Sequence, residues 1–235
     1  MVSLSLPRPY YQDHLVTIYH ADFRQILPSL APNSVDLVLT DPPYGINYQS
    51  KRKGSLVPTS VRGDDSLNDL RAVLPLSDAL LKHDRHAYVF AAPTKLGQAM
   101  DAMNDFWRLK NVLVWDKGNA GTRGDLTAGF ANNWEAILYG SKGRRPLIGP
   151  RPRCVYRHDW QASRDPVHPT VKPVGMMSWL IAKSTDRGEL VLDPFTGSGV
   201  VLRAAAELGR RAIGIDVEEC HCETAARRVS ASITT

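Results

Sequence analysis

The 235-residue sequence lacks any long apolar run free of charge, and it contains no internal repeat or low-complexity tract. A helical membrane span needs about 20 consecutive apolar residues, which no stretch approaches. The N-terminus, MVSLSLPRPYYQDH, has no charged start followed by an apolar core, so it does not read as a secretion signal. These absences argue against membrane-spanning, secreted and solenoid classes, and we expect a folded cytoplasmic protein.

Cysteine is scarce, with Cys154 alone and Cys220 and Cys222 flanking His221. An odd cysteine count fits a reducing compartment better than a disulfide framework. Zinc binding by this Cys-His-Cys run is disfavoured, because adjacent ligands lack the paired spacing of zinc knuckles. We therefore expect no metal site, and we expect Cys220 and Cys222 to be small buried thiols on a helix.

Length and charge set further bounds. A chain of 235 residues with 43% hydrophobic residues can bury one well-packed core, so we expect a single domain over residues 1–235. The formal net charge of +5 favours a polyanionic partner, although many basic proteins never bind nucleic acid.

Strand and helix patterns alternate along the chain. Short β-branched and apolar runs predict seven strands, at residues 15–20, 35–40, 86–92, 111–116, 135–140, 190–193 and 211–216. Helical periodicity, with Ser66 and Thr94 as expected N-caps, predicts helices at 23–30, 66–83, 94–106, 174–185, 199–209 and 218–230. Such alternation predicts an α/β fold with a mostly parallel sheet and helices on both faces.

Two polar, glycine-containing stretches without periodicity, residues 45–64 and 141–168, interrupt this scheme. Long irregular loops in compact domains are commonly functional. The second is rich in arginine interleaved with aromatic residues, a mixture that suits phosphates and stacked bases, although a solvated loop is the alternative. The basic residues expected to contact nucleic acid are Lys51, Arg52, Lys53, Arg144, Arg145, Arg151, Arg153 and Arg157.

Residues 190–216, LVLDPFTGSGVVLRAAAELGRRAIGID, read as strand, glycine turn, helix, strand and acid. In nucleotide-binding units of this kind the glycines admit the ligand to the backbone, and the acid, here Asp216, takes the ribose hydroxyls. Leu202 stands where a dinucleotide fingerprint has a third glycine, which argues against a pyrophosphate ligand. Adenosine binding is therefore favoured over a plain structural turn.

A second motif, Asp41-Pro42-Pro43-Tyr44, ends the predicted strand VDLVLT. By itself it is compatible with a simple turn, because proline and glycine punctuate chains everywhere.

Taken together, the motifs resemble those of amino-group DNA methyltransferases. DPFTGSG looks like their S-adenosylmethionine-binding motif, DPPY like their catalytic motif, and HPTVKPVGMMSWLI, residues 168–181, like their third hallmark. The order of motifs is similar to the circularly ordered β group, and the resemblance spans residues 15–230. It implies a Rossmann-like fold and methyl transfer from S-adenosylmethionine to an amino group in duplex DNA, without a covalent enzyme intermediate.

The resemblance also implies roles for individual residues. Asp41 and the carbonyl of Pro42 would accept hydrogen bonds from the target amino group, Pro43 would stiffen the loop, and Tyr44 would stack on an extruded base. Thr170 and Lys172 would hold the methionine carboxylate and Asp22 the adenine edge. The full expected cofactor set is Asp22, Asp41, Thr170, Lys172, Asp193, Phe195, Thr196, Gly197, Ser198, Gly199 and Asp216.

Plainer readings remain for several of these residues. Asp22 could be a helix N-cap and Lys172 a surface charge, while His168 and Trp179 could simply pack.

The target base follows from the same resemblance. Asp at the first position of the tetrapeptide is associated mainly with adenine-N6 and Ser with cytosine-N4, so Asp41 favours adenine. Methylation of a cytosine ring carbon needs a cysteine nucleophile, and Cys154 has no evident activating partner. Residues 45–64 and 141–167 would read the target, and the short recognition region predicts a homodimer. Cytosine-N4 methylation, an RNA or protein substrate, and a non-catalytic nucleic-acid-binding protein remain alternatives.

Overall fold

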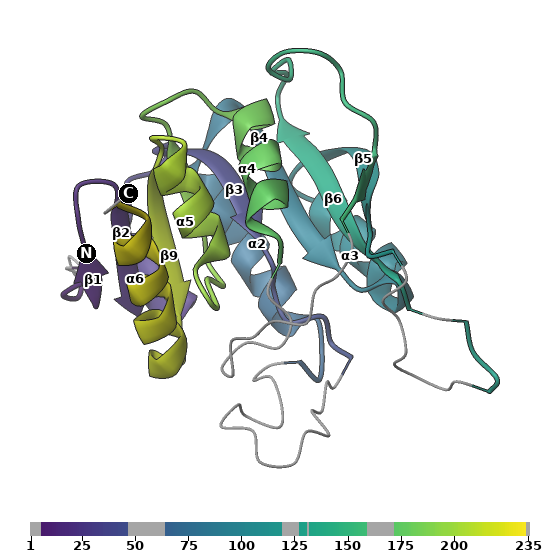
Figure 1. The fold of residues 1–235 in the computed structure, drawn as a ribbon, viewed down its shortest axis with the longest axis horizontal. Coiled ribbons are helices and arrows are strands. Elements are labelled where there is room, and N and C mark those ends of the chain that lie inside the picture. The colour runs from purple at the N-terminus through teal and green to yellow at the C-terminus, as the bar shows by residue number, and fades with distance from the viewer. Residues whose placement is uncertain (1–5, 47–63, 119–126, 131, 159–171, 234–235) are drawn as a thin grey trace.

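The computed structural model describes residues 6–46, 64–118, 127–130, 132–158 and 172–233. Within them the chain forms a nine-stranded sheet in the order β1-β2-β9-β8-β3-β4-β6-β5-β7 (Figure 1). The strands are β1 (Tyr11–Gln12), β2 (Val16–His20), β3 (Val35–Thr40), β4 (Leu81–Ala91), β5 (Arg108–Asp116), β6 (Trp134–Lys142), β7 (Val155–Arg157), β8 (Leu190–Asp193) and β9 (Arg211–Asp216).

The sheet is mixed. Strands β2, β9, β8, β3 and β4 run parallel to one another, whereas β6 runs antiparallel to both β4 and β5. All seven predicted strands form and lie consecutively in the sheet, which confirms the α/β class. The prediction of seven strands is incomplete, because two short strands, β1 and β7, extend the edges within the described residues.

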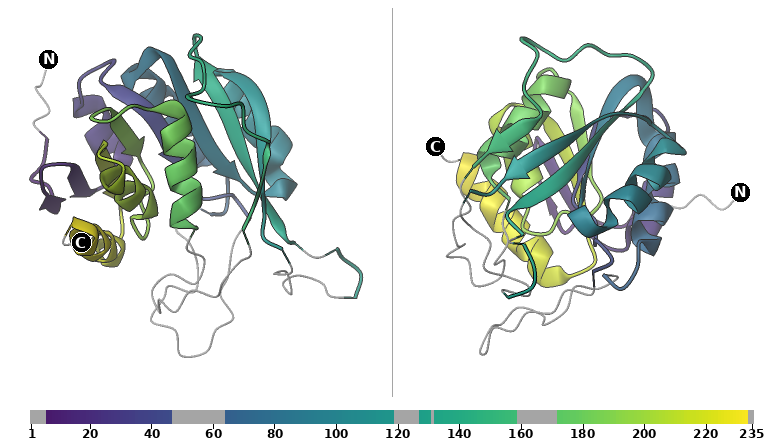
Figure 2. Two further views of the ribbon diagram at one scale, coloured as in Figure 1. Left: turned by 45° about the horizontal axis from the view of Figure 1, so that its top comes forward. Right: turned by 90° about the vertical axis from the view of Figure 1, so that its right-hand side faces the viewer.

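Six helices cover the two faces of the sheet within the described chain (Figure 2). Helices α1 (Phe23–Ile26), α2 (Asn68–Leu80) and α3 (Leu96–Asn104) pack on one face, with 3-10 turns at Leu27–Ser29 and Pro93–Lys95. Helices α4 (Val174–Ser184), α5 (Val200–Glu207) and α6 (Glu219–Ile233) pack on the other. None of the helices in these parts of the chain has the length and hydropathy needed to span a bilayer.

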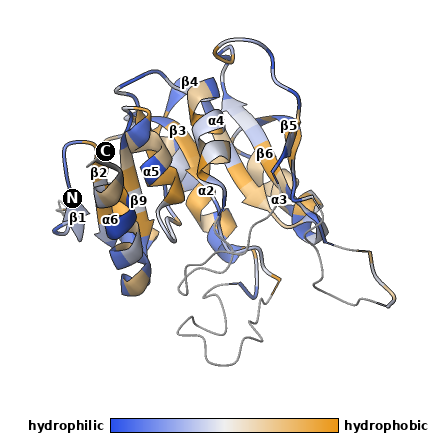
Figure 3. Ribbon diagram, in the orientation of Figure 1, coloured by the Kyte–Doolittle hydropathy of each residue, from blue (hydrophilic) through white to orange (hydrophobic). Residues whose placement is uncertain are grey.

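Strand β3 contributes side chains to the hydrophobic core on both faces of the sheet. Leu37 and Leu39 point into the core under α4–α6, whereas Val35 and Val38 point into the core under α1–α3. Side chains alternate between the two faces from Leu37 onward, and a register shift between Val35 and Leu37 accounts for Val35 lying on the face of Val38. Both faces of this central strand are covered, so every residue of β3 is buried. Figure 3 shows the resulting hydrophobic centre of the sheet.

The structure differs from four local predictions. Residues 81–83 were expected to continue a helix, but Leu81 begins β4 and pairs with Val35. Ser66 is not the N-cap of α2: Leu67 occupies that position, and the Ser66 hydroxyl accepts from the Asn68 amide at 3.4 Å. Thr94 lies in the 3-10 turn before α3 and does not cap that helix. The segment expected to be irregular after residue 140 contains the end of β6 and all of β7.

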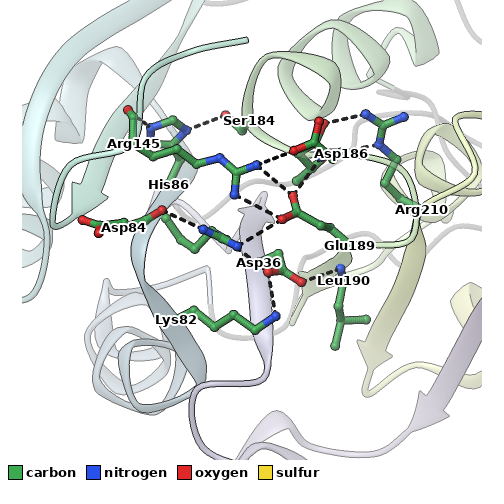
Figure 4. A network of polar contacts seen from close by, with 12 residues as sticks. Asp36, Lys82, Asp84, His86, Arg145, Ser184, Asp186, Glu189, Leu190 and Arg210 are labelled. Carbon is green, nitrogen blue, oxygen red and sulfur yellow. Dashed lines mark hydrogen bonds and ion pairs between the residues drawn. The ribbon is translucent and has the colours of Figure 1, made fainter.

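An ion-pair network closes the edge of the sheet where β3, β4 and β8 begin (Figure 4). Asp36, whose side chain is only 2% exposed, accepts from Lys82 at 2.7 Å and Arg85 at 3.0 Å through Oδ1. Its Oδ2 accepts from the Leu190 amide at 3.0 Å. Arg85 also bonds Glu189 at 3.1 Å. These contacts tie together the beginnings of β3, β4 and β8.

Arg145 extends this network from the segment that follows β6. Its guanidinium bonds Glu189 at 3.1 and 3.2 Å and Asp186 at 2.9 Å. Its carbonyl oxygen lies 3.0 Å from Nε2 of His86, whose Nδ1 lies 2.9 Å from the hydroxyl of Ser184. Burial lowers the pKa of His86, so the ring is neutral and acts as a hydrogen-bonding spacer. We call Asp36, Lys82, Arg85, Arg145 and Glu189 the amino-edge network.

Candidate active site

Acidic residues gather at the opposite edge of the sheet, where the parallel strands end. Asp193 and Asp216 are the last residues of β8 and β9, and Asp41 directly follows β3. Glu135 joins them because β6 is antiparallel to β4, so the beginning of β6 lies beside the end of β4. In open α/β sheets, ligands bind at this carboxyl edge.

The glycine turn after β8 is built around Asp216. The Gly197 amide donates to Oδ2 of Asp216 at 2.7 Å, which joins the turn to the end of β9. Oδ1 of Asp216 accepts from the Glu218 amide at 2.9 Å and lies 3.1 Å from Nδ1 of His221. Burial alone would lower the pKa of His221, but the hydrogen bond to Asp216 raises it. The carboxylate of Asp216 is therefore held in one orientation beside the turn.

The two glycines of this turn face different surroundings. Both have positive φ, +50° at Gly197 and +76° at Gly199, a region that side chains with a Cβ rarely adopt. A Cβ at Gly199 would lie 2.6 Å from Cβ of Ala225 on α6, so this glycine allows α5 and α6 to pack closely. A Cβ at Gly197 would meet nothing within 4 Å. The backbone of Gly197 is thus open to approach by a ligand, as a nucleoside-binding turn requires.

Asp193 lies beneath the turn and is 2% exposed. Its Oδ1 accepts from the hydroxyl of Thr40 at 2.9 Å and from the Phe195 amide at 3.2 Å, and its carbonyl accepts from the hydroxyl of Thr196. Burial raises the pKa of Asp193 to about 7, with a smaller contribution from the negative charges of nearby acids. These contacts make Asp193 a brace between β3 and the glycine turn.

Asp41 belongs to a cluster of four charged side chains and one phenol. Lys172 donates to Oδ2 of Asp41 at 2.5 Å and lies 3.0 Å from Oε2 of Glu135 and 3.2 Å from the hydroxyl of Tyr44. The Tyr44 hydroxyl donates to Oδ1 of Asp41 and lies 3.2 Å from Glu135. Lys117, at the end of β5, bonds the other oxygen of Glu135. We call Asp41, Tyr44, Lys117, Glu135 and Lys172 the catalytic-edge cluster.

Charges within the cluster balance. Burial alone would raise the pKa of Glu135, but Lys172 and Lys117 hold it at about 2. Burial alone would lower the pKa of Lys172, but the carboxylates of Asp41 and Glu135 raise it. Burial and the same two acids raise the pKa of Tyr44, so the phenol keeps its proton. Two carboxylates and two ammonium groups thus satisfy one another in a largely enclosed space.

Several predicted cofactor residues have contacts that bear on their roles. Lys172 is only 10% exposed in its side chain, so its reading as a surface charge is wrong. Asp22 is the N-cap of α1 and accepts from the Arg24 amide at 2.9 Å, which agrees with the plainer reading of this residue. Trp179 packs against Tyr156. Thr170 and His168 lie outside the described residues.

The arginines expected to bind nucleic acid lie at different ends of the molecule. Arg144 and Arg145 follow β6 at the amino edge, and the side chain of Arg145 already belongs to the amino-edge network. Arg157, 70% exposed in its side chain, ends β7 at the carboxyl edge beside Asp116. Arg151 and Arg153 are exposed between these two ends. Lys51, Arg52 and Lys53 lie outside the described residues.

Sequence patterns did not single out two members of the cluster, Glu135 and Lys117. The signal available for Glu135 was an acid at the start of a predicted strand, but its position at the catalytic edge depends on the antiparallel direction of β6.

Cys222 is buried as expected, whereas the prediction for Cys220 is wrong, because Cys220 is exposed on α6. Among the described residues, no group of three His, Cys, Asp or Glu side chains is arranged to hold a metal ion.

The fold and the carboxyl-edge site together define a Rossmann-like methyltransferase domain. The chain belongs to the DNA methylase family of N6 and N4 amino-group enzymes, which it matches over residues 35–167 and 150–227. It is similar to the type II methyltransferase M2.DpnII of Streptococcus pneumoniae, with 26% identity over 96% of this chain and 94% of that protein. The family takes its methyl group from S-adenosylmethionine.

Solved structures share the fold. A crystal structure of an M1.HpyAVI–SAM complex has a TM-score of 0.70 at 22% identity and covers 92% of this chain and 100% of that chain. The PvuII DNA methyltransferase, described as cytosine-N4-specific, has a TM-score of 0.78 at 16% identity and covers 94% of this chain and 88% of that chain.

Proposed function

We propose that this protein, as one catalytic domain over residues 1–235, transfers a methyl group from S-adenosylmethionine to the N6 amino group of adenine in duplex DNA. The observation that carries this proposal is the position of Asp41. Its carboxylate is fixed at the carboxyl edge of the sheet, in the same edge as the open glycine turn at Gly197. An amino-group acceptor and a nucleoside site therefore share one edge.

The cofactor would occupy the turn and the ends of β8, β9 and β2. The open backbone of Gly197 and the oriented carboxylate of Asp216 suit the ribose and the methionine portion. Phe195, Thr196, Ser198 and Gly199 complete the turn, while Asp22 would approach the adenine edge from the start of α1. When bound, S-adenosylmethionine supplies an electrophilic methyl group on its sulfonium.

The protein's own groups would prepare the amino nitrogen. Its lone pair is delocalised into the base, and acceptors aimed at its two protons favour the pyramidal geometry in which the lone pair can react. Asp41 and the carbonyl of Pro42 would be these acceptors. The side chain of Tyr44 is partly exposed beside them, and Pro43 stiffens the loop. The target base must leave the duplex to reach this position.

Adenine is proposed because Asp, and not Ser, begins the DPPY motif. Cytosine-N4 is the alternative, since the family includes both chemistries and the PvuII enzyme of similar fold is described as cytosine-N4-specific.

DNA would lie along the carboxyl edge, contacted by the region 45–64 and by the later part of the region 141–167, because residues 142–145 lie at the amino edge. Arg157, exposed at that edge, is the described basic residue best placed to meet a phosphate. We also propose that the protein acts as a homodimer, because its recognition region is short. Sedimentation at micromolar concentration should give a dimer, and a fully active monomer would contradict this part of the proposal.

Expression in a bacterial host free of DNA methylation, followed by modification-sensitive sequencing of the genome, tests the activity and the base together. We expect N6-methyladenine at one short sequence motif, and none in cells that express Asp41→Ala. N4-methylcytosine in its place would select the alternative base. An unmodified genome, despite soluble protein, would contradict the enzyme proposal and favour a binding protein.

Purified variants separate the two halves of the site. Asp41→Ala should retain S-adenosylmethionine binding and lose at least about 100-fold in methyl transfer, the usual range for removing one electrostatic contact to a reacting group. Asp216→Ala should instead weaken cofactor binding. Competition between duplex DNA and RNA for labelled methyl groups separates the two substrate classes.

A further inference from the structure

We propose that Lys172 is a positioning residue for Asp41, braced by Glu135, and that it does not bind the methionine carboxylate. This inference rests on the proposed function, because it concerns the carboxylate that would receive the target amino group. It reassigns Lys172 from the cofactor to the catalytic acid and gives Glu135 a part in the reaction.

The hydrogen bonds of Lys172 are the first argument. An ammonium group has three donors and no acceptor. The three acceptors around Nζ are Oδ2 of Asp41 at 2.5 Å, Oε2 of Glu135 at 3.0 Å and the hydroxyl oxygen of Tyr44 at 3.2 Å. All three donors are thus used by groups of this chain, and a methionine carboxylate would have to displace one of them.

The remaining capacity of Asp41 is the second argument. A carboxylate offers about four lone-pair sites. Lys172 takes one on Oδ2 and the hydroxyl of Tyr44 takes one on Oδ1, so the group is anchored through both oxygens and each oxygen keeps a further site. The side chain of Asp41 is 34% exposed, against 10% for Lys172. Lys172 and Tyr44 therefore hold the carboxylate of Asp41, while part of it stays open to a substrate.

The support behind Lys172 is the third argument. The ammonium lies 5.1 Å from the ring centre of Phe90 and 5.5 Å from that of Tyr44, so aromatic faces enclose it. Glu135 holds it at 3.0 Å and is itself bonded to Lys117. Asp41 and Glu135 share this lysine, so its loss would leave Asp41 without a charged partner in the cluster and held by the hydroxyl of Tyr44 through one oxygen.

The experiment compares four variants with the wild type on unmethylated bacterial genomic DNA. Lys172→Met removes the charge at nearly constant length, and Lys172→Arg retains it. Glu135→Gln removes the brace but leaves Lys172 in place. Lys142→Met is the matched control, because Lys142 is a half-buried lysine paired with Asp78 at the amino edge. Two quantities are measured: the dissociation constant for S-adenosylmethionine by calorimetry, and the single-turnover methylation rate at saturating cofactor and DNA.

If Lys172 positions Asp41, Lys172→Met lowers the saturating rate at least about 100-fold while the cofactor dissociation constant stays within about threefold. Lys172→Arg recovers at least tenfold of that loss. Glu135→Gln lowers the rate about threefold to tenfold without changing cofactor binding, since Lys172 keeps Asp41 but loses its brace. Lys142→Met leaves both quantities unchanged.

The opposite pattern overturns the inference. A ligand of the methionine carboxylate would show a dissociation constant raised at least tenfold in Lys172→Met, with the saturating rate retained. Glu135→Gln would then tighten cofactor binding, because it frees the lysine from a competing carboxylate. A Lys172→Met protein that does not fold leaves Glu135→Gln to decide between these opposite results. A wild type that transfers no methyl group contradicts the proposed function itself, before any variant is compared.

Discussion

The amino-edge network and the catalytic-edge cluster are built from the same chemistry at opposite ends of one sheet. In the amino-edge network, Asp36 is 2% exposed and both its oxygens are engaged, by Lys82 and Arg85 on one and by the Leu190 amide on the other. In the catalytic-edge cluster, Asp41 is anchored through both oxygens yet remains 34% exposed. A carboxylate enclosed by its partners ties strands together, whereas one that keeps an open side can accept a substrate.

The largest expected effect tests the enclosed side of this comparison. Asp36→Ala leaves Lys82 without its carboxylate partner, leaves Arg85 with Glu189 as its remaining acid, and leaves the Leu190 amide without its side-chain acceptor. Removing one partner of a buried pair costs about 3–5 kcal/mol, and because both cations are partly exposed we expect about 3 kcal/mol here. Urea denaturation measures this loss, and Asp41→Ala should lose less, about 1–2 kcal/mol, because Asp41 is 34% exposed and Glu135 still pairs with Lys172. Equal losses in the two variants would remove the distinction between the edges.

Asp193 tests whether burial or position in the sheet determines the role of a carboxylate. It is fully enclosed, as Asp36 is, although it lies at the catalytic edge. Its pKa in the folded protein is raised from 3.8 to about 7, so the folded state binds the proton more tightly than the unfolded state. The unfolding free energy should therefore fall as the pH rises from about 4 through about 7. Between pH 5 and pH 8 the wild type should lose roughly 2 kcal/mol that Asp193→Asn does not lose. Parallel pH profiles for the two proteins would contradict the shift.

Gly197 and Gly199 show the same contrast between a position that is open to a ligand and one that is enclosed by the protein. Gly199→Ala combines an unfavourable positive φ with a contact to Ala225, and should destabilise the protein by about 2 kcal/mol. Gly197→Ala carries only the backbone cost, about 1 kcal/mol, but places a methyl group where a ligand would approach. Thermal unfolding and calorimetric titration with S-adenosylmethionine should therefore rank the two variants in opposite orders. A normal cofactor affinity in Gly197→Ala would place the ligand elsewhere.

The smallest effect concerns the arginines. Arg157 is exposed at the catalytic edge, so Arg157→Ala should weaken DNA binding about threefold to tenfold and reduce its salt dependence by about one counterion. Arg145→Ala should leave DNA affinity unchanged and lower stability, because Arg145 bonds Glu189 and Asp186. Fluorescence anisotropy across a salt series, with urea denaturation alongside, measures both quantities. A loss of DNA affinity in Arg145→Ala would extend the interface to the amino edge.

Local patterns were sufficient for features that depend on near neighbours in the chain. The seven central strands form where β-branched and apolar runs occur, and α5 begins directly after Gly199, because side-chain periodicity and turn chemistry act within a few residues. The residues that depend on pairing between distant segments were predicted less well. Leu81 does not continue the preceding helix, because it pairs with Val35 in the sheet. Val155–Arg157 forms a strand because it pairs with β5.

The sequence by itself determined the α/β class, the glycine turn with its acid, and the DPPY motif at the end of a buried strand. The tertiary structure alone decided that Lys172 meets Asp41 across 131 positions, that Glu135 joins them, and that Arg145 closes the far edge. The physical reason is that motifs reflect short-range backbone geometry, whereas the partner of a charge depends on strand order and direction, which arise only when the whole sheet assembles.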